Sequence, residues 1–482
     1  MLNYLIHKSR IGSIGCGFLI GFLWTHELTA REDQPVQLGS RLELFVDHHL
    51  IEAMDGVELR LHQPVKAPRP KSPLPEQHMV TVIKDGGKYR AWYRGKDPSY
   101  VGVTHHGNAG ETVHYAESRD GHEWEFPHLR LHEIGGSREN NVILADFAPF
   151  AATFMPFLDT RPGVSPDARY KAVAGYPGPG NKVGLDEPGR GLFVFASPDG
   201  IAWRNLGEAI RYRPEWRHAF DSPNVAFWSE AEQLYVCYFR TWTRPENLRG
   251  VSRATSPDFV NWSEPVEVHP NQPGEHLYTT MTHPYVRAPH IYIALPTRFV
   301  PGRGSAPGYE QKDVNATDIL FMSKRAGRAQ FDRTFMEGFI RPGLEPKQWI
   351  NRANYVALNV VPTSPTELSI YHRSGDRYVL RTDGFASAHA GAKTGRLVTK
   401  PLSFAGAQLQ LNLSTSAVGS VQVELLDLQD VVLATSHEQF GDEIGRTVTW
   451  RDRADVAEFA GKPVRLRFTL TDADLYSFRF RP

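Results

Sequence analysis

The sequence predicts an all-β protein, a five-bladed β-propeller followed by a C-terminal β-sandwich. A turn motif that ends in tryptophan recurs between residues 118 and 262, and strand pairs joined by tight turns precede its copies. Short strands with alternating apolar and polar residues then fill residues 379–482. Helical periodicity is scarce, and 11% of the residues are aromatic, a composition that suits strands and tight turns.

The recurring motif has the form Ser-x-Asp-Gly-x-x-Trp. Its copies begin at Ser118, Ser197 and Ser256, and the tryptophan follows the serine by six residues in each. Asp-Gly, or a variant of it, turns the chain between two strands, and the tryptophan starts the next strand. A weaker copy begins at Ser323 and ends at Phe331. A four-stranded unit that recurs in this way predicts a propeller, in which similar sheets surround one axis.

Five such units can be assigned along the chain. They begin near Glu76, Phe147, Phe220, His276 and Trp349. The fifth unit lacks a complete outer part, and we expect residues 42–51 and 58–62 to supply it and so close the ring. The alternative is a stack of unrelated hairpins in a sandwich.

The chain divides into three parts. Residues 1–30 form a predicted signal peptide, residues 31–378 the propeller and residues 379–482 the sandwich. In the last part about seven short strands alternate apolar and polar residues, with turn residues between them. We find no cluster of chemical groups there, so we expect a packing or carbohydrate-contacting role.

The N-terminal segment indicates export. Lys8 and Arg10 supply a positive region, residues 11–24 form an apolar run of 14 residues, and Ala30 is a small residue before a cleavage site. A run of this length is short for a membrane span, and an uncleaved membrane anchor is the alternative. We therefore expect a periplasmic or extracellular protein with no membrane contact after cleavage. Its mature part has one cysteine, Cys237, and so no intrachain disulfide.

The charge balance argues against a nucleic-acid partner, and the histidine spacing argues against a metal site. Lys plus Arg and Asp plus Glu number 54 each, which argues against a nucleic-acid partner. His105 and His106, with His78 and His114 nearby, lack the ligand spacing of a metal site, so we expect no metal cofactor. A structural calcium ion held by loop oxygens is the alternative that the sequence leaves. The sequence does not indicate the oligomeric state.

Several segments, together with the repeat, resemble a known superfamily. They are Phe45-Val46-Asp47, Phe157–Pro162, Phe220–Asn224, Arg341-Pro342-Gly343 and Gly461–Phe468. The chain resembles the five-bladed glycoside hydrolases of families 32, 43, 62 and 117, most closely secreted bacterial family-32/43-like hydrolases of unknown specificity. The resemblance implies a propeller with a central site and a carbohydrate substrate. The family-32 motifs Trp-Met-Asn-Asp-Pro-Asn-Gly, Arg-Asp-Pro and Glu-Cys are absent, so it assigns no confirmed catalytic group.

Three carboxylates are the candidate catalytic residues. Hydrolysis of a glycosidic bond needs one acid to protonate the leaving oxygen and a second carboxylate to attack or to activate water. Inner strands converge on the axis, so acids near their beginnings can face one another. By position in the superfamily, Glu76 is the expected base or nucleophile. Asp159 is expected to orient the sugar or stabilise the transition state, and Asp221 is the expected acid, with Glu275 as its substitute. The alternatives are turn capping for the aspartates and a solvated loop position for Glu76.

Other residues around these acids are candidates for substrate binding. They are Arg240, Trp242, Glu275, Arg298, Trp349 and Arg352. Arginine forks bind hydroxyls or carboxylates, and aromatic faces can pack on sugar rings. Several arginines near the axis would suit an acidic sugar, whereas Trp349 could also belong to the packing between blades.

The sequence thus predicts an exported glycoside hydrolase-like protein that cleaves a poly- or oligosaccharide with paired carboxylates at the propeller axis. One alternative is a carbohydrate-binding propeller without catalysis, which the missing family motifs favour. The other is a sialidase-like or lyase activity that uses the arginines. A sixth blade, or an arginine cluster paired with tyrosine at the axis, would favour that alternative.

Overall fold

The computed structural model describes residues 34–104, 106–176, 191–213, 216, 219–243, 245–303 and 315–482. The predicted signal peptide lies outside these residues. Strands make up nearly all the regular structure, and the described helical elements are short 3₁₀ turns. No helix in the described ranges is long and apolar enough to cross a membrane.

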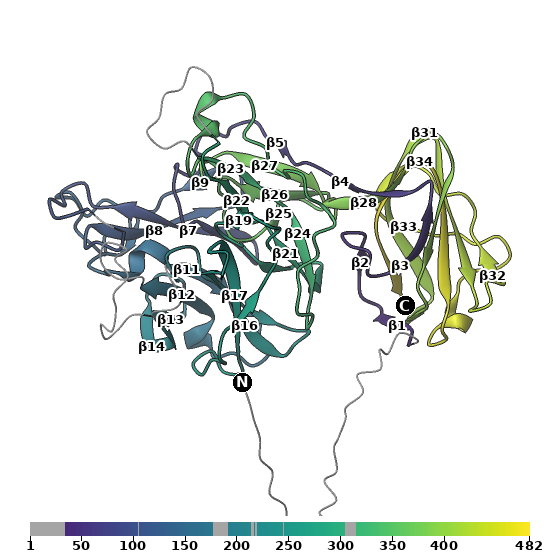
Figure 1. Cartoon of the computed structure of the whole chain (residues 1–482), viewed down its shortest axis with the longest axis horizontal. Helices are drawn as coiled ribbons and strands as arrows, with labels where there is room; N and C mark the ends of the chain where they lie inside the picture. Colours follow the sequence, from purple (N-terminus) through teal and green to yellow (C-terminus); the bar gives the residue numbers. More distant parts are fainter. Residues whose placement is uncertain are drawn as a thin grey trace, which may run out of the picture. The chain divides into compact units, whose positions relative to one another are not determined.

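Three antiparallel sheets form the first three blades (Figure 1). The first contains β6 (Thr81–Asp85), β7 (Lys88–Lys96), β8 (Glu111–Ser118), β9 (Trp124–Glu125) and β10 (Val142–Leu144). The second contains β11 (Met155–Leu158), β12 (Tyr170–Tyr176), β13 (Gly191–Ser197) and β14 (Arg204–Arg211). The third contains β15 (Val225–Ser229), β16 (Leu234–Trp242), β17 (Arg249–Ser256) and β18 (Val266–Val268).

The fourth blade is broken along its length into two three-stranded sheets. One contains β19 (His276–Leu277), β22 (Thr297–Val300) and β23 (Ala316–Ile319). The other contains β20 (His283–Tyr285), β21 (Ala288–Ala294) and β24 (Met322–Arg325). Pro296 lies between β21 and β22, where it cannot donate a ladder hydrogen bond, so a break there is expected.

The fifth blade closes the ring with a different segment from the one predicted. It contains β25 (Val361–Pro362), β26 (Glu367–Tyr371), β27 (Arg377–Arg381) and the N-terminal strand β5 (Val65–Lys66). The pairing of β5 with β27 covers two residues on each strand. Residues 42–51 and 58–62, which we expected in this position, instead contribute to the C-terminal sheet, because their pairing partners are β28, β29 and β34.

The C-terminal sheet is built on two long strands, β31 (Gln408–Leu426) and β34 (Arg465–Arg481), which pair with each other (Figure 1). The strands that flank β34 or lie beyond its neighbours are β2 (Glu43–Leu44), β3 (Ile51–Asp55), β4 (Glu58–Leu61), β28 (Ala386–Ala390) and β29 (Gly395–Thr399). Those that flank β31 are β32 (Val432–Thr435) and β33 (Asp442–Thr447). A separate parallel pair joins β1 (Val36–Gly39) to β30 (Leu402–Phe404).

A bend in the long strands turns this sheet into a sandwich. The register of β31 against β34 shifts between Thr415 and Ser420. A Cβ at Gly419 would lie 2.3 Å from the carbonyl oxygen of Asp472, so the bend needs glycine. Apolar residues from both halves of β31, such as Leu411 and Val423, belong to one buried cluster. The fold is therefore a five-bladed propeller followed by a β-sandwich, as predicted. The predicted boundary between residues 378 and 379 falls inside β27, and four residues separate the end of β27 from β28.

The repeated motif forms one compact hydrogen-bonded turn. In the first copy, the Ser118 hydroxyl donates to Asp120 (3.0 Å) and accepts from the Gly121 amide (2.8 Å). The Asp120 carboxylate also accepts from the amides of His122 (2.7 Å) and Glu123 (3.0 Å). Serine and aspartate are required because their oxygens satisfy backbone donors that the turn leaves unpaired.

The second and third copies, at Ser197 and Ser256, form the same hydrogen bonds. The fourth residue of the motif has a positive φ in all three, 76° at Gly121, 80° at Gly200 and 73° at Phe259. Glycine adopts this conformation without strain, whereas the third copy holds a phenylalanine in it.

These turns also tie neighbouring blades together. The Trp92 indole of the first blade donates to the Gly200 carbonyl of the second (2.7 Å). The Tyr371 hydroxyl of the fifth blade donates to the Gly121 carbonyl of the first (2.7 Å). The weaker copy at Ser323 does not form the turn, since this residue lies in β24 and bridges to Asp332.

Candidate functional site at the propeller axis

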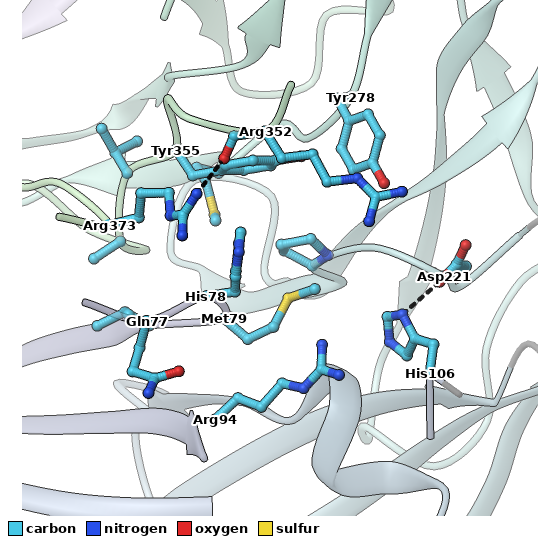
Figure 2. Close-up of a pocket in the computed structure, with 15 residues that line it drawn as sticks. Gln77, His78, Met79, Arg94, His106, Asp221, Tyr278, Arg352, Tyr355 and Arg373 are labelled. Carbon is cyan, nitrogen blue, oxygen red and sulfur yellow. Dashed lines mark hydrogen bonds and ion pairs between the residues drawn. The ribbon is translucent and has the colours of Figure 1, made fainter. Parts of the chain in front are cut away.

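A cavity of about 150 Å³ lies where the inner strands begin (Figure 2). Segments that precede inner strands of the first, third, fourth and fifth blades supply most of its wall. The described lining residues are Gln77, His78, Met79, Val80, Arg94, His106, Asp221, Pro223, Tyr278, Met281, Arg352, Tyr355, Val356, Ala357 and Arg373. The inner strands thus converge on the axis as predicted, but most of the side chains that line the cavity differ from those predicted.

Asp221 is the one carboxylate among the described lining residues. Its Oδ1 lies 3.0 Å from Nδ1 of His106, and its Oδ2 accepts a hydrogen bond from Arg240 (3.1 Å). Burial alone would raise the pKa of Asp221, but the hydrogen bond from His106 and the charge of Arg240 outweigh it and hold the pKa well below its usual range. The carboxylate is therefore ionised at any physiological pH.

A constrained backbone holds Asp221 in place. Phe220 has a φ of 63°, and its carbonyl accepts a hydrogen bond from the side-chain amide of Asn224 (3.2 Å). The Ser222 hydroxyl donates to the carbonyl of Tyr278 (2.9 Å), which joins this turn to the fourth blade. The Asp-Ser-Pro-Asn segment thus caps its own turn and also presents a carboxylate to the cavity.

Arginines dominate the charge of this cavity. Arg94 forms an ion pair with the buried Glu111. Arg373 donates to Glu76 (2.9 Å) and to the backbone carbonyl of Arg352 (2.6 Å), and Figure 2 shows the side chains of Arg94 and Arg352 on opposite sides of the cavity.

Two more arginines lie behind the wall. Arg240 and Arg249 each place their guanidinium 5.2 Å from the centre of the Tyr278 ring. Burial lowers the pKa of Arg249, and the neighbouring charge of Arg240 lowers it further. Positive charge is thus concentrated around the ring of Tyr278.

His78 and Tyr355 lie close together in the cavity wall, and both are neutral near pH 7. Burial, followed by the charges of Arg373, Arg94 and Arg352, lowers the pKa of His78 to about 3, so its imidazole is neutral near pH 7. The ring of Tyr355 lies 5.3 Å from that of His78 and 5.6 Å from that of Tyr278, in edge-to-face contacts. Burial raises the pKa of Tyr355 well above its usual value, so this residue stays a phenol.

The structure brings three of the predicted residues to this cavity, namely Asp221, Arg240 and Arg352. Asp221 and Arg352 line it, and Arg240 is buried beside Asp221. Trp242 lies further back, with its ring 4.7 Å from the guanidinium of Arg249.

Glu76 and Asp159 do not join Asp221, which corrects the prediction of three acids in one pocket. The Glu76 side chain is 67% exposed and pairs with Arg373. Asp159 has no exposed side-chain surface, pairs with Lys171 and accepts a hydrogen bond from Tyr235 (2.6 Å). Asp159 follows β11, whereas Asp221 precedes β15. Neighbouring inner strands run in the same direction. The two aspartates therefore lie near opposite ends of the propeller axis.

Glu275, Arg298 and Trp349 also lie outside the axial cavity. Glu275 forms a two-pronged ion pair with Arg333 (2.8 and 3.1 Å), and both side chains are nearly buried. Arg298 pairs with Asp318 and, together with Trp349, lines a second cavity.

Sequence reasoning missed Arg94, Arg373, Tyr278 and Tyr355, and it weighed the histidines only as metal ligands. Placement in the segment that leads into an inner strand is the signal that could have identified Tyr278 and Tyr355. His114 stacks on Tyr93, and His105 lies outside the described residues. Over the described ranges, no group of three or more His, Cys, Asp or Glu side chains is placed to hold a metal ion.

The fold and the site define a five-bladed propeller with a cationic cavity at its axis. No family model matches the chain, and no curated protein matches it. Similar solved structures include a family-43 arabinoxylan arabinofuranohydrolase from Bacillus subtilis, at 12% identity and TM-score 0.39, covering 87% of this chain and 99% of that one. A glycosyl hydrolase from Bacteroides ovatus has 15% identity and TM-score 0.39, covering 68% and 94%.

A third similar structure is a β-1,2-mannobiose phosphorylase from Listeria innocua, at 10% identity and TM-score 0.42, covering 67% of this chain and 95% of that one. Two of these three proteins are glycoside hydrolases, the class that the sequence resembles. At these identities and TM-scores the similarity assigns neither a ligand nor a reaction to this chain.

Proposed function

We propose that the chain binds a carboxylated saccharide in the axial cavity. The observation that carries this proposal is the charge balance. Five arginines lie in or directly behind the cavity wall: Arg94, Arg240, Arg249, Arg352 and Arg373. Three of them, Arg94, Arg352 and Arg373, line the cavity itself, and Asp221 is the one carboxylate among the described lining residues.

The chemistry of the wall suits an acidic sugar. Planar guanidinium groups match a carboxylate with two parallel hydrogen bonds, and a partly enclosed site strengthens that attraction. The rings of Tyr278 and Tyr355 provide apolar faces with phenolic hydroxyls. The ionised Asp221 can accept hydrogen bonds from sugar hydroxyls.

Cleavage of the bound saccharide is a second candidate function, which the contact between His106 and Asp221 favours. The paired-carboxylate mechanism expected from sequence would need Glu76 or Asp159 beside Asp221. Without such a pair of carboxylates, proton transfer would fall to His106, with Asp221 orienting the imidazole. Arginines beside tyrosines at the axis are the arrangement expected of the sialidase-like or lyase alternative.

Binding measurements on matched ligands test the proposal. The probes are size-matched fragments of pectate, alginate and hyaluronan, each measured as the free acid and as its methyl ester. Esterification removes the charge and keeps the sugar backbone. We expect the best-bound acid to bind at least about tenfold more tightly than its ester and to weaken as salt is raised. Equal binding of the two forms, or no binding of any acid, would overturn the proposal.

Product analysis of the same mixtures separates binding from cleavage. New reducing ends with water incorporated indicate hydrolysis, and unsaturated uronate ends indicate elimination. Intact ligand after long incubation indicates binding alone. An exported location, as residues 1–30 predict, would place the cavity where such polysaccharides occur.

A further inference from the structure

We propose that a second saccharide subsite lies around Trp349 and binds a sugar ring further along the same chain. This inference rests on the proposed function, because it extends the ligand that the axial cavity binds. The protein would then bind an oligosaccharide, with an acidic sugar unit in the axial cavity and a more distant sugar ring on the indole of Trp349.

The subsite is a cavity of about 740 Å³ on the fourth blade. Trp349 ends the 3₁₀ turn η4 (Pro346–Trp349), and 36% of its surface is exposed. Its indole nitrogen donates to the carbonyl of Gly343 (2.8 Å), which fixes the plane of the ring. A half-exposed, oriented aromatic ring beside a cavity provides the flat apolar face on which a sugar ring packs.

The polar groups of this cavity suit an acidic ligand. Arg298 is held by Asp318 through two contacts (3.0 and 2.5 Å) and donates to the carbonyl of Met336 (3.2 Å). Arg303 and Arg341 also line the cavity and are exposed. Asp318 is the one carboxylate among the described lining residues, so positive charge again exceeds negative.

Short segments connect this cavity to the axial one. Arg352 follows Trp349 by three residues, which limits their Cα atoms to a separation of about 11 Å. Arg298 is paired with Leu277 in the sheet, and the next residue, Tyr278, lines the axial cavity. An oligosaccharide bound at the axis would therefore need to extend only a short distance to reach the indole.

Asn354 fixes the connecting segment. Its backbone amide donates to the Thr317 hydroxyl (3.1 Å), and its side-chain amide donates to the carbonyls of Thr317 (2.7 Å) and Gln348 (2.8 Å). Its own carbonyl accepts from the Thr297 hydroxyl (3.2 Å). Both subsites are thus held by one rigid support, which lowers the entropic cost of binding a longer ligand.

Chain-length dependence tests the inference. The probes are size ladders of oligogalacturonate, alginate and hyaluronan fragments from disaccharide to octasaccharide, titrated into the mature chain and into Trp349→Ala. We expect the wild-type affinity to rise with length. Trp349→Ala should lose about tenfold in affinity for the long fragments and leave the disaccharide unchanged. Phe440→Ala is the matched control, because Phe440 is an exposed aromatic residue of the sandwich.

Arg341→Gln provides a second test that does not depend on the packing of the indole. This exposed side chain should contribute to the affinity for long acidic fragments, and its removal should also weaken the salt dependence of their binding. Equal loss for short and long fragments, or no loss in either variant, would overturn the distal subsite while leaving the axial site intact. Failure of every acidic ladder to bind the wild-type chain would overturn both proposals.

Discussion

The inner strands of the propeller end in two very different cavities. Where the strands begin, arginines, histidines and tyrosines surround Asp221. Where they finish, a cavity of about 310 Å³ is lined mainly by apolar residues from all five blades, among them Ile83, Leu158, Phe227, Val286 and Val361. We call the axial cavity around Asp221 the polar mouth and the cavity at the opposite end of the inner strands the apolar mouth.

Asp221 and Asp159 show what this difference means. Asp159 is fully buried and its charge is matched by Lys171, so the pair stabilises the wall of the second blade. Asp221 is also buried, with 8% of its surface exposed, but it lines a cavity whose described lining residues include three arginines and no other carboxylate. A charged residue near the axis therefore indicates a binding site only where it lines a cavity together with other charged side chains.

The largest expected effect comes from breaking the balanced pair. Asp159→Asn leaves the Lys171 ammonium buried without a counter-charge, and the free energy of unfolding should fall by about 3–5 kcal/mol in urea titrations. Saccharide affinity should stay unchanged where the variant is folded. Glu76→Gln is the control, because its exposed pair with Arg373 should contribute less than about 1 kcal/mol. A stable Asp159→Asn protein that no longer binds saccharide would reverse our assignment of the two ends.

A pH effect should follow from His283, which lines the apolar mouth. Burial lowers the pKa of His283 to about 4, whereas an unfolded histidine titrates near 6.5. Between these values the unfolded state binds more protons, so stability should fall as pH decreases from 6.5 to 4, by about 3 kcal/mol for this residue.

Urea titrations from pH 7 to pH 5 check this expectation. His283→Gln should flatten the pH dependence, and His128→Gln, at an exposed position, should leave it unchanged. Identical slopes in the wild type and His283→Gln would show that the apolar mouth does not exclude the charged imidazole.

A smaller change is expected from Arg352→Gln at the polar mouth. Removal of one charged hydrogen-bond donor should weaken binding of a carboxylated saccharide about 10- to 100-fold, measured by calorimetry. The same titration with Arg138→Gln, an exposed arginine of a first-blade loop, should match the wild type. Unchanged affinity in Arg352→Gln would show that the charge of this arginine does not contribute to saccharide binding in the polar mouth.

The smallest effect is expected in the repeated turns. Ser197→Ala removes the hydroxyl that joins Asp199 and the Gly200 amide, at a cost of about 1 kcal/mol in the free energy of unfolding. Thermal and urea unfolding should show this loss with no change in affinity at either mouth. A loss of affinity would mean that the turns also position the site.

Residue patterns predicted the parts of this molecule that depend on local chemistry. The Ser-x-Asp motifs at Ser118, Ser197 and Ser256 use hydrogen bonds within a few residues, so their turns could be predicted. Asp221 was correctly expected near the axis because it precedes an inner strand.

Other features depend on contacts between distant segments. Asp159 was misplaced because composition does not show on which side of β11 it falls, and that side decides the end of the axis. The two-residue strand β5 closes the ring through pairing with β27, which no local pattern reveals. His106 reaches Asp221 from the first blade across more than 100 residues of sequence, so the pair appears only in the folded chain.

A crystal structure of the chain with a bound acidic oligosaccharide is the most direct test of the central claim. We predict a sugar carboxylate within hydrogen-bonding distance of the guanidinium groups of Arg94 or Arg352, with sugar hydroxyls on Asp221. Electron density for the sugar at the apolar mouth, or only on the sandwich, would contradict the assignment of the polar mouth as the functional site.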